Sequence, residues 1–341
     1  MNTKQLAVSV LNLAPVRAGF DSRQAIEAMT LLAQQTEQLG YCRYWVAEHH
    51  NTPGLVSSAT SILISHLLQH TEQIRIGSGG VMLPNHSPLM VAEQYGTLET
   101  LYPNRVDLGL GRAPGTDQAT TQALRRNPAI ESALSFPDDV RTLQRYLGDA
   151  DKQGFVKAYP GIGTHVPLYI LGSSTESAYL AAELGLPYVF AAHFAPRMLQ
   201  SAVAIYRQQF KPSNVLAAPY FILCLNVIAA ETDAEAELLA TSQQRIFLNV
   251  VRNTRLPLQP PKAIAVGEIE THEQQVLDSM TACTLLGSSE SVANQLDELQ
   301  RIINADEMMV VSYIYDQEKQ LNSYRLFKQI AERCYSRFNL D

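Results

Sequence analysis

Several features are scarce in this sequence, and each absence excludes a class of protein. No apolar run is long enough to span a bilayer, and no signal-peptide core follows the N-terminus. We therefore expect a cytoplasmic protein without membrane contact. The four cysteines are scattered and lack CxxC spacing, which predicts reduced thiols and no metal site. The 26 basic residues are outnumbered by 33 acidic ones and form no stripe, so nucleic acid is not an expected partner.

The composition that remains is that of a folded enzyme. Hydrophobic residues make up 46% of the chain and charged residues 17%, with no low-complexity tract, which is typical of a soluble globular protein. The length of 341 residues allows two domains or one large α/β barrel. Length alone leaves that choice open.

Alternating strand-like and helix-like segments run along the chain. Short β-branched or apolar runs alternate with segments of helical period, which indicates parallel βα units. The expected strands cover residues 6–13, 44–47, 74–78, 105–110, 166–171, 187–191, 220–230 and 307–313. Eight such units predict a (β/α)8 TIM barrel. A doubly wound open sheet is the competitor, but no GxGxxG motif opens the first helix.

Residues 253–281 interrupt this alternation. Pro257, Pro260 and Pro261 lie in a stretch without a strong period, so we expect an insertion before the last strand. The whole chain, residues 1–341, is then one barrel domain. Long segments near barrel mouths are often lids, and we expect 253–281 to be a mobile one.

Candidate functional residues stand where the expected strands end, because barrel enzymes place reactive groups at these ends. The second strand ends on Glu48, His49 and His50, of which only one histidine is expected to face a ligand. A strand end with hydrogen-bonded histidines is the plainer alternative. The other strand ends offer Gly79, Gly80, Arg112, Ser173, Ser174, Ser177 and His193.

An anion site is predicted at two of these strand ends. A helix that begins at Ser174 or Thr175 presents free backbone N–H groups and hydroxyls, and Arg112 supplies a fixed positive charge. The alternatives are an ordinary N-cap for the serines and a surface salt bridge for Arg112.

Four motifs at four strand ends resemble one known family. They are Trp45-Val46-Ala47-Glu48-His49-His50-Asn51, the run Gly77 to Pro88, the run Asn104 to Arg112, and Gly172-Ser173-Ser174. Together they are similar to the bacterial luciferase-like flavin monooxygenases, above all to the alkanal-monooxygenase-like group. The resemblance spans about residues 5 to 337 and is specific for the fold, less so for flavin and hardly for substrate.

The resemblance implies a cofactor, which is reduced FMN bound at the C-terminal mouth of the barrel and supplied by a separate flavin reductase. Arg112, Ser173, Ser174 and Ser177 match the positions that bind its phosphate. Gly79-Gly80 matches a non-proline cis peptide beneath the isoalloxazine ring.

The resemblance also implies a reaction, in which a flavin hydroperoxide formed with O2 oxygenates a small organic substrate. His49 matches the histidine near the reactive flavin edge, and a histidine that titrates near neutral pH is the acid/base candidate. Glu48 either orients His49 or pairs with an arginine, and His50 has a structural or hydrogen-bonding role. His86 is a further candidate for the mouth. His193 stands where luciferase has a tryptophan, which makes light emission with long aldehydes doubtful.

Two other functions fit the same barrel. One is a flavin-binding protein without turnover, and the other is a hydride-transfer oxidoreductase that uses deazaflavin instead of FMN. The family likeness and the apolar surface of the early helices favour a homodimer.

Overall fold

The structure is a computed structural model that describes residues 6–113, 115–124 and 134–338. None of the helices in these ranges has the length and apolar character needed to cross a membrane. Cys42, Cys224 and Cys283 are free thiols.

Eight parallel strands close into a barrel, as the sequence predicts. The ring runs β1-β2-β3-β4-β5-β6-β7-β9 and closes by the pairing of β9 with β1, while β8 pairs with β7 outside the ring. The strands are β1 Ala7–Asn12, β2 Arg43–Val46, β3 Arg75–Met82, β4 Val106–Gly111, β5 Leu168–Gly172, β6 Tyr188–Ala191, β7 Phe221–Ala229, β8 Thr284–Gly287 and β9 Glu307–Val311.

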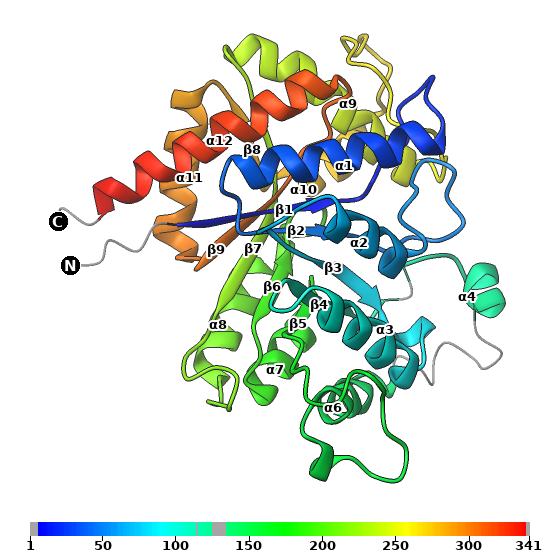
Figure 1. Cartoon of the computed structure of the whole chain (residues 1–341). Helices are drawn as coiled ribbons and strands as arrows, with labels where there is room; N and C mark the ends of the chain where they lie inside the picture. The colour runs from blue at the N-terminus through cyan, green and yellow to red at the C-terminus, as the bar shows by residue number, and fades with distance from the viewer. Residues whose placement is uncertain (1–5, 114, 125–133, 339–341) are drawn as a thin grey trace.

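Helices surround this barrel, as Figure 1 shows. Several begin at side-chain caps, such as Asp21 before α1, Thr232 before α9 and Ser288 before α11, which satisfy backbone N–H groups of the first turn. The helices are α1 Ser22–Gln38, α2 Thr60–Gln69, α3 Pro88–Leu101, α4 Gln118–Leu124, α6 Phe136–Leu147, α7 Thr175–Leu184, α8 Leu199–Gln209, α9 Asp233–Val251, α10 Thr271–Thr281, α11 Ser289–Ile303 and α12 Gln317–Phe338.

Strand β3 is longer than predicted. It continues through Gly79-Gly80 to Met82, and its register against β4 shifts between Ser78 and Val81. Two adjacent glycines signal the end of a strand in a sequence, whereas here they form an irregularity inside one.

The interpretation of residues 253–281 as unpatterned is wrong in part. Residues Thr271–Thr281 form α10, which begins with a capping box between Glu270 and Glu273. The four-residue strand β8 follows and was not predicted at all. Helix α4 lies in the stretch between β4 and α6, for which the sequence predicts no strand, and residues 125–133 of that stretch lie outside the described residues. Short helices and strands contain too few repeats of their hydrophobic period to be recognised in a sequence.

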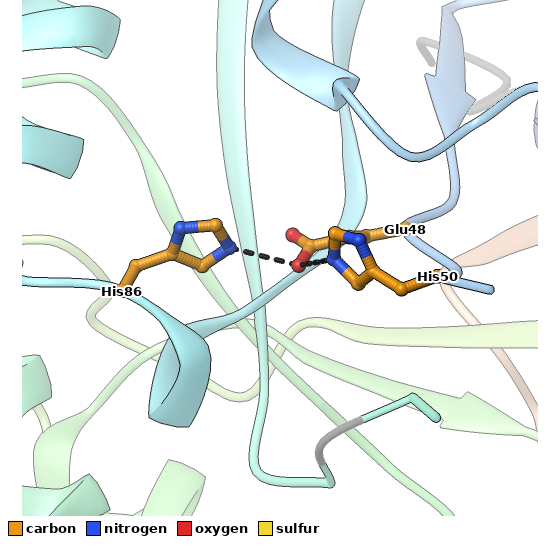
Figure 2. A group of neighbouring side chains, drawn as sticks. All are labelled: Glu48, His50 and His86. Carbon is orange, nitrogen blue, oxygen red and sulfur yellow. Dashed lines mark hydrogen bonds and ion pairs between the residues drawn. The ribbon is translucent and has the colours of Figure 1, made fainter. Parts of the chain in front are cut away.

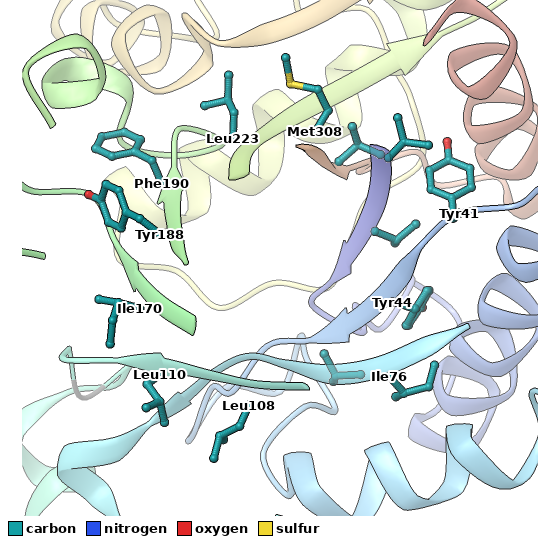
Figure 3. Close-up of a cluster of buried hydrophobic side chains, with 14 of the residues drawn as sticks. Tyr41, Tyr44, Ile76, Leu108, Leu110, Ile170, Tyr188, Phe190, Leu223 and Met308 are labelled. Atoms are coloured by element: carbon teal, nitrogen blue, oxygen red, sulfur yellow. The ribbon is translucent and has the colours of Figure 1, made fainter. Parts of the chain in front are cut away.

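The side chains of the strands divide into two cores. Those that point outward, such as Tyr44, Leu108 and Phe190, pack under the surrounding helices (Figure 3). Those that point inward, such as Trp45, Tyr169 and Met309, fill the barrel. This alternation follows from the two-residue period of a strand.

A buried ionic network closes the barrel at the N-terminal ends of its strands. Arg43, the first residue of β2, donates from Nε to Glu307 Oε1 at 2.8 Å and from Nη1 to Asp107 Oδ2 at 2.8 Å. Tyr220 donates to Glu307 at 2.7 Å, and Trp45 donates to Asp107 at 3.0 Å. Arg75 and the hydroxyls of Ser9 and Tyr169 complete the set. The mouth of the barrel at the opposite end is therefore the only open end of its interior that the described residues leave.

Candidate functional site

A cavity of about 680 Å³ lies at the C-terminal ends of the strands. This volume falls in the range of small-molecule and cofactor sites. Most of the residues that the sequence singled out line it, namely His49, His50, Gly79, Gly80, Arg112, Ser173, Ser174, Ser177 and His193. Glu48 and His86 are not among its lining residues. The strand-end argument thus brings residues from five strands, β2 to β6, to one site.

The side of the cavity at α7 has the features of an anion site. Ser174 occupies the N-cap position of α7 with extended backbone, and its side chain caps no backbone N–H of the helix. The ordinary N-cap alternative is therefore not what the structure has. Arg112 is exposed and forms no ion pair with any residue in the described ranges, so the salt-bridge alternative is not found either. At the start of α7 the Glu176 side chain hydrogen bonds to the Ser174 side chain and to its own backbone N–H, and the charge of Arg112 also lowers the pKa of Glu176. The guanidinium and the remaining N–H groups of the first turn lie at one cavity and favour an anionic ligand.

Ser177 is held more firmly than the other two serines. Its hydroxyl donates to the carbonyl of Ser174 at 2.7 Å and lies 3.0 Å from the hydroxyl of Tyr188. Ser173 and Ser174 are half-buried at the cavity. Ser177 therefore shapes the turn that opens α7. The Ser174 side chain hydrogen bonds to Glu176, so Ser173 is the freest of the three serines to contact a ligand.

The peptide bond between Gly79 and Gly80 is cis, as the resemblance implied. Both glycines line the cavity with backbone alone. A Cβ atom at Gly79 would lie 2.5 Å from Leu11 Cδ1, and one at Gly80 would lie 2.8 Å from the carbonyl oxygen of Gly109. This part of β3 has no room for side chains.

His49 faces the cavity with an unpartnered nitrogen. Its Nδ1 is buried and has no hydrogen-bond partner among the described residues. Burial lowers the pKa of His49 below its ordinary value, and the nearby Glu48 carboxylate offsets this only in part. The direction of this shift favours the neutral form of His49. A neutral imidazole at pH 7 is suited to accept a proton.

Glu48 does not hydrogen bond to His49 or to an arginine, contrary to both expectations. Its Oε1 lies 2.8 Å from His50 Nε2 and 2.8 Å from His86 Nε2, and its Oε2 accepts from Met82 N at 3.1 Å (Figure 2). Burial alone would raise the pKa of Glu48, but these hydrogen bonds outweigh it and lower the pKa. Because an ionised carboxylate only accepts, both imidazoles donate from Nε2.

The same three residues form the one group in the described chain whose ligand atoms lie close enough to hold a metal ion, within 4.8 Å of one another. The sequence had predicted no metal site. Their 2.8 Å separations are hydrogen-bond distances, and the carboxylate is satisfied by its three donors. The arrangement explains the hydrogen-bonding role expected of His50.

His193 lies deeper in the cavity than its position after β6 suggested. It is 7% exposed, and its Nδ1 has no partner in the part of the chain that is described. Burial, with a smaller contribution from His49, lowers the pKa of His193 to about 3. Asn226 of β7 donates from Nδ2 to the carbonyl of His193 at 2.5 Å and so fixes the turn that carries it.

The sequence reasoning missed the apolar interior of the site. Cys224, Phe247, Met309 and Tyr313 line the cavity and belong to the core inside the barrel. Tyr313 follows β9 directly, so an extension of the strand-end argument to the last strand would have found it. Cys224 lies in β7, whose nine residues are all buried, so no alternation of apolar and polar residues marks which side chains point inward.

The beginning of the insertion crosses the mouth. Asn253, Thr254, Arg255 and Leu256 line the cavity. Arg255 Nη2 lies 2.8 Å from Asp117 Oδ2, and Arg255 also donates to the carbonyl of Asn51. Asn51 Nδ2 donates to Asp117 at 3.1 Å. We refer to Asn51, Asp117 and Arg255 as the clasp. It joins the segments that follow β2 and β4 to the segment that follows α9.

The insertion is also attached beyond the clasp. Leu258 is fully buried, and its backbone exchanges hydrogen bonds with Val16 and Ala18 at 2.9 and 2.8 Å. Met280 of α10 lines the cavity as well. The part of 253–281 that covers the mouth is thus its first four residues.

Comparison with known sequences gives one consistent result. The family model described as luciferase-like monooxygenase matches residues 7–304. A luciferase-like monooxygenase of Escherichia coli K12 is 45% identical over 97% of this chain and 99% of its own. N-acetyl-S-alkylcysteine monooxygenase of Bacillus subtilis 168 is 31% identical over 94% of this chain and 97% of its own.

Solved structures give the same result for the fold. Apo-MsnO8 has a TM-score of 0.84 with 33% identity and covers 95% of this chain and 98% of its own. The oxygenating constituent of 3,6-diketocamphane monooxygenase of Pseudomonas putida, in complex with FMN, has a TM-score of 0.75, 15% identity and coverage of 96% and 98%. An F420-dependent secondary alcohol dehydrogenase has a TM-score of 0.64, 15% identity and coverage of 96% and 98%.

Proposed function

The chain belongs to the luciferase-like monooxygenase family and is an oxidoreductase that uses a flavin or deazaflavin, and from this premise we propose that it is a reduced-FMN-dependent monooxygenase of a small organic substrate. One observation carries the proposal. Arg112 and the start of α7, where the Ser174 side chain caps no backbone N–H, border the same cavity as His49, whose Nδ1 has no partner among the described residues. A phosphate site and a proton acceptor thus share one cavity.

The phosphate is assigned to Arg112, Ser173, Ser174 and the N–H groups of the first turn of α7. The guanidinium supplies charge and two parallel donors, and the helix N-terminus adds the positive end of its dipole. Ser177 keeps the turn in place through its hydrogen bond to Ser174. Gly79 and Gly80 offer a backbone surface without side chains for the flat ring.

His49 is assigned the proton transfer. Reduced FMN, when bound, supplies the electrons that activate O2. Burial favours the neutral form of His49, whose one acceptor nitrogen is available to take a proton. Glu48, His50 and His86 hold the adjoining turn through their shared hydrogen bonds. The apolar interior around Phe247 and Tyr313 excludes water.

The reduced flavin is proposed to come from a separate reductase. No dinucleotide-binding GxGxxG motif is present in the sequence, so the chain carries no recognisable nicotinamide site of its own. FMN rather than deazaflavin is proposed because relatives with 45% and 31% identity are described as monooxygenases, whereas the F420-dependent neighbour is a dehydrogenase.

Residues 253–281 are proposed to act as a lid. Its first four residues line the mouth and the clasp holds them to Asn51 and Asp117. Opening the clasp would admit the cofactor. Protease cleavage within 253–281 should therefore slow when reduced FMN binds, and cleavage at an unchanged rate would contradict the lid.

A homodimer in the cytoplasm is also proposed. Ile62 of α2 and Met90 and Leu101 of α3 are large apolar side chains exposed on the early helices. Such residues favour association between copies. Sedimentation of the wild type and of Ile62→Glu tests this, and a monomer in both cases would contradict it.

Cofactor binding is the first test. Purified protein is titrated with FMN, reduced FMN and deazaflavin, followed by absorbance. Arg112→Ala should weaken FMN by about 1.5 to 3 kcal/mol, the range for a hydrogen bond to a charged group. Arg23→Ala is the matched control, because Arg23 lies on α1 in an exposed pair with Glu27. Unchanged affinity in Arg112→Ala would overturn the phosphate assignment.

Turnover is the second test. Oxygen uptake with reduced FMN is compared between the wild type and His49→Ala at equal FMN occupancy. Coupled oxygenation that falls at least about a hundredfold in the variant supports the proton role, because general acid–base catalysis contributes about 10² to 10⁴. Tight FMN binding with no oxygenation of any substrate tested would instead favour a flavin-binding protein without turnover.

A further inference from the structure

Two buried imidazoles border the interior of the cavity without hydrogen-bond partners. The Nδ1 atoms of His49 and His193 are both buried and unpaired within the described residues, and both side chains line the cavity. The two rings are near enough to influence each other's protonation. Buried polar side chains without partners that line a cavity point to a ligand.

The structure around these imidazoles is apolar. Cys224, Phe247, Met309 and Tyr313 line the same interior. Full charges among the described lining residues are restricted to Arg112, Asp117 and Arg255. Asp117 and Arg255 pair with each other in the clasp, and Arg112 lies at the phosphate side. No fixed charge remains to receive a charged group in the interior.

The histidines cannot supply that charge themselves. Burial lowers the pKa of His193 to about 3 and also lowers that of His49, so both are neutral near pH 7. A neutral imidazole has one donor and one acceptor nitrogen. It can bind a carbonyl or hydroxyl, whereas a carboxylate or ammonium would be buried without a counter-charge.

We propose that the substrate occupies a subsite between His49 and His193 and is an uncharged, mostly apolar molecule whose single polar group hydrogen bonds to His193. The inference rests on the proposed function for its assignment of His49 to the proton step, and it adds the substrate class and a specificity-determining residue. Asn226 supports this role, because its hydrogen bond to the carbonyl of His193 holds that residue in place.

The test uses a matched pair of probes on the full chain, both without and with saturating FMN. Cyclohexanone is the uncharged probe and cyclohexanecarboxylate is its anionic counterpart. Binding is followed by the imidazole ¹⁵N resonances of His193 in histidine-labelled protein. We expect saturable shifts with the ketone and at least about tenfold weaker binding of the carboxylate.

Two variants isolate the hydrogen bond. His193→Phe keeps a ring but removes both nitrogens, and His193→Gln keeps a donor and an acceptor. For these variants the ketone affinity is measured by competition with a fluorescent apolar probe. We expect a loss of about threefold to tenfold in His193→Phe, the effect of one neutral hydrogen bond, and partial recovery in His193→Gln.

Several results would overturn the subsite. These are equal or tighter binding of the carboxylate, no shift of the His193 resonances with either probe, or an unchanged ketone affinity in His193→Phe. Failure of the proposed function is distinguishable, because it appears in the separate FMN titration as absent cofactor binding, while the probe titration without FMN still reports on the subsite.

Discussion

The two ends of the barrel differ in how completely their buried polar groups are hydrogen bonded. At the N-terminal end, Arg43 hydrogen bonds to Asp107 and Glu307, and the carboxylates receive further donors from Arg75, Trp45 and Tyr220. At the C-terminal end, His49 and His193 each retain a buried nitrogen without a partner in the described chain. The first end is complete without a ligand, and the second is not.

This difference separates stability from function within one barrel. Breaking a fully paired ionic network costs much free energy, because removal of one member leaves another charge buried without a partner. In a site with unpaired polar atoms, the folded protein already has the desolvation cost of those atoms. A ligand that hydrogen bonds to them would offset this cost. Substitutions at the two ends should therefore change the free energy of unfolding in different directions.

The largest effect is expected from Arg43→Met. The change leaves Asp107 and Glu307 without their shared cation, so the free energy of unfolding should fall by about 3 to 5 kcal/mol. Urea unfolding measures it. Arg23→Ala, which breaks the exposed pair with Glu27, serves as the control and should have almost no effect. A loss below about 1 kcal/mol in Arg43→Met would remove the distinction between the two ends.

The buried His193 at the mouth should make the free energy of unfolding depend on pH. In the unfolded chain a histidine has a pKa of about 6.5, whereas burial lowers that of His193 to about 3. Between these values the unfolded state binds a proton that the folded state does not, so stability falls as pH falls, by at most about 1.4 kcal/mol per pH unit. Urea unfolding at pH 7 and pH 5 should show a smaller loss in His193→Phe than in the wild type. An equal loss in both would show that His193 does not titrate in this way.

A matched pair of polar deletions should have opposite signs at the two ends. His193→Phe removes an unpaired nitrogen and should raise the free energy of unfolding by about 1 kcal/mol at pH 7.5. Tyr220→Phe removes a donor to the buried Glu307 and should lower it by about 1.5 to 3 kcal/mol. Thermal and urea unfolding measure both. Destabilisation by His193→Phe would mean that this imidazole has a structural role instead.

The smallest effect on stability is expected at the clasp. Arg255 and Asp117 are partly exposed, so their pair contributes little to folding. Arg255→Ala should leave the unfolding midpoint unchanged and raise the dissociation rate of FMN about twofold to fivefold, measured by stopped-flow fluorescence. Lys152→Ala, which breaks another exposed pair with Asp149, is the control. An FMN dissociation rate equal to that of the control would indicate that the clasp does not retain the cofactor.

Sequence reasoning was most successful where a pattern extends over a whole strand or strand end. All eight predicted barrel strands are present, because each is a continuous apolar run of sufficient length. It failed for α10 and β8, which are short and mixed in composition. The predicted strand 74–78 is also too short. Gly79 and Gly80 resemble a turn in the sequence, but in the structure they belong to β3.

The partners of individual side chains were harder to predict. Glu48 was expected to orient His49 or to pair with an arginine, yet it binds His50 and His86. His86 is 38 residues away in the sequence, so no local spacing connects the two. The direction in which the pKa of His49 shifts could not be predicted for a related reason, since its burial depends on segments from several parts of the chain.

By itself, the sequence determined the barrel, the family and the strand ends that carry the candidate residues, because these follow from local periodicity and short motifs. Only the tertiary structure decided which of these residues face one cavity, which histidines are neutral, and which polar atoms lack partners. The physical reason is that desolvation and hydrogen-bond satisfaction depend on every group that surrounds an atom in space. His49 and His193 are 144 positions apart in the numbering, 193 minus 49, and they meet only when the barrel closes.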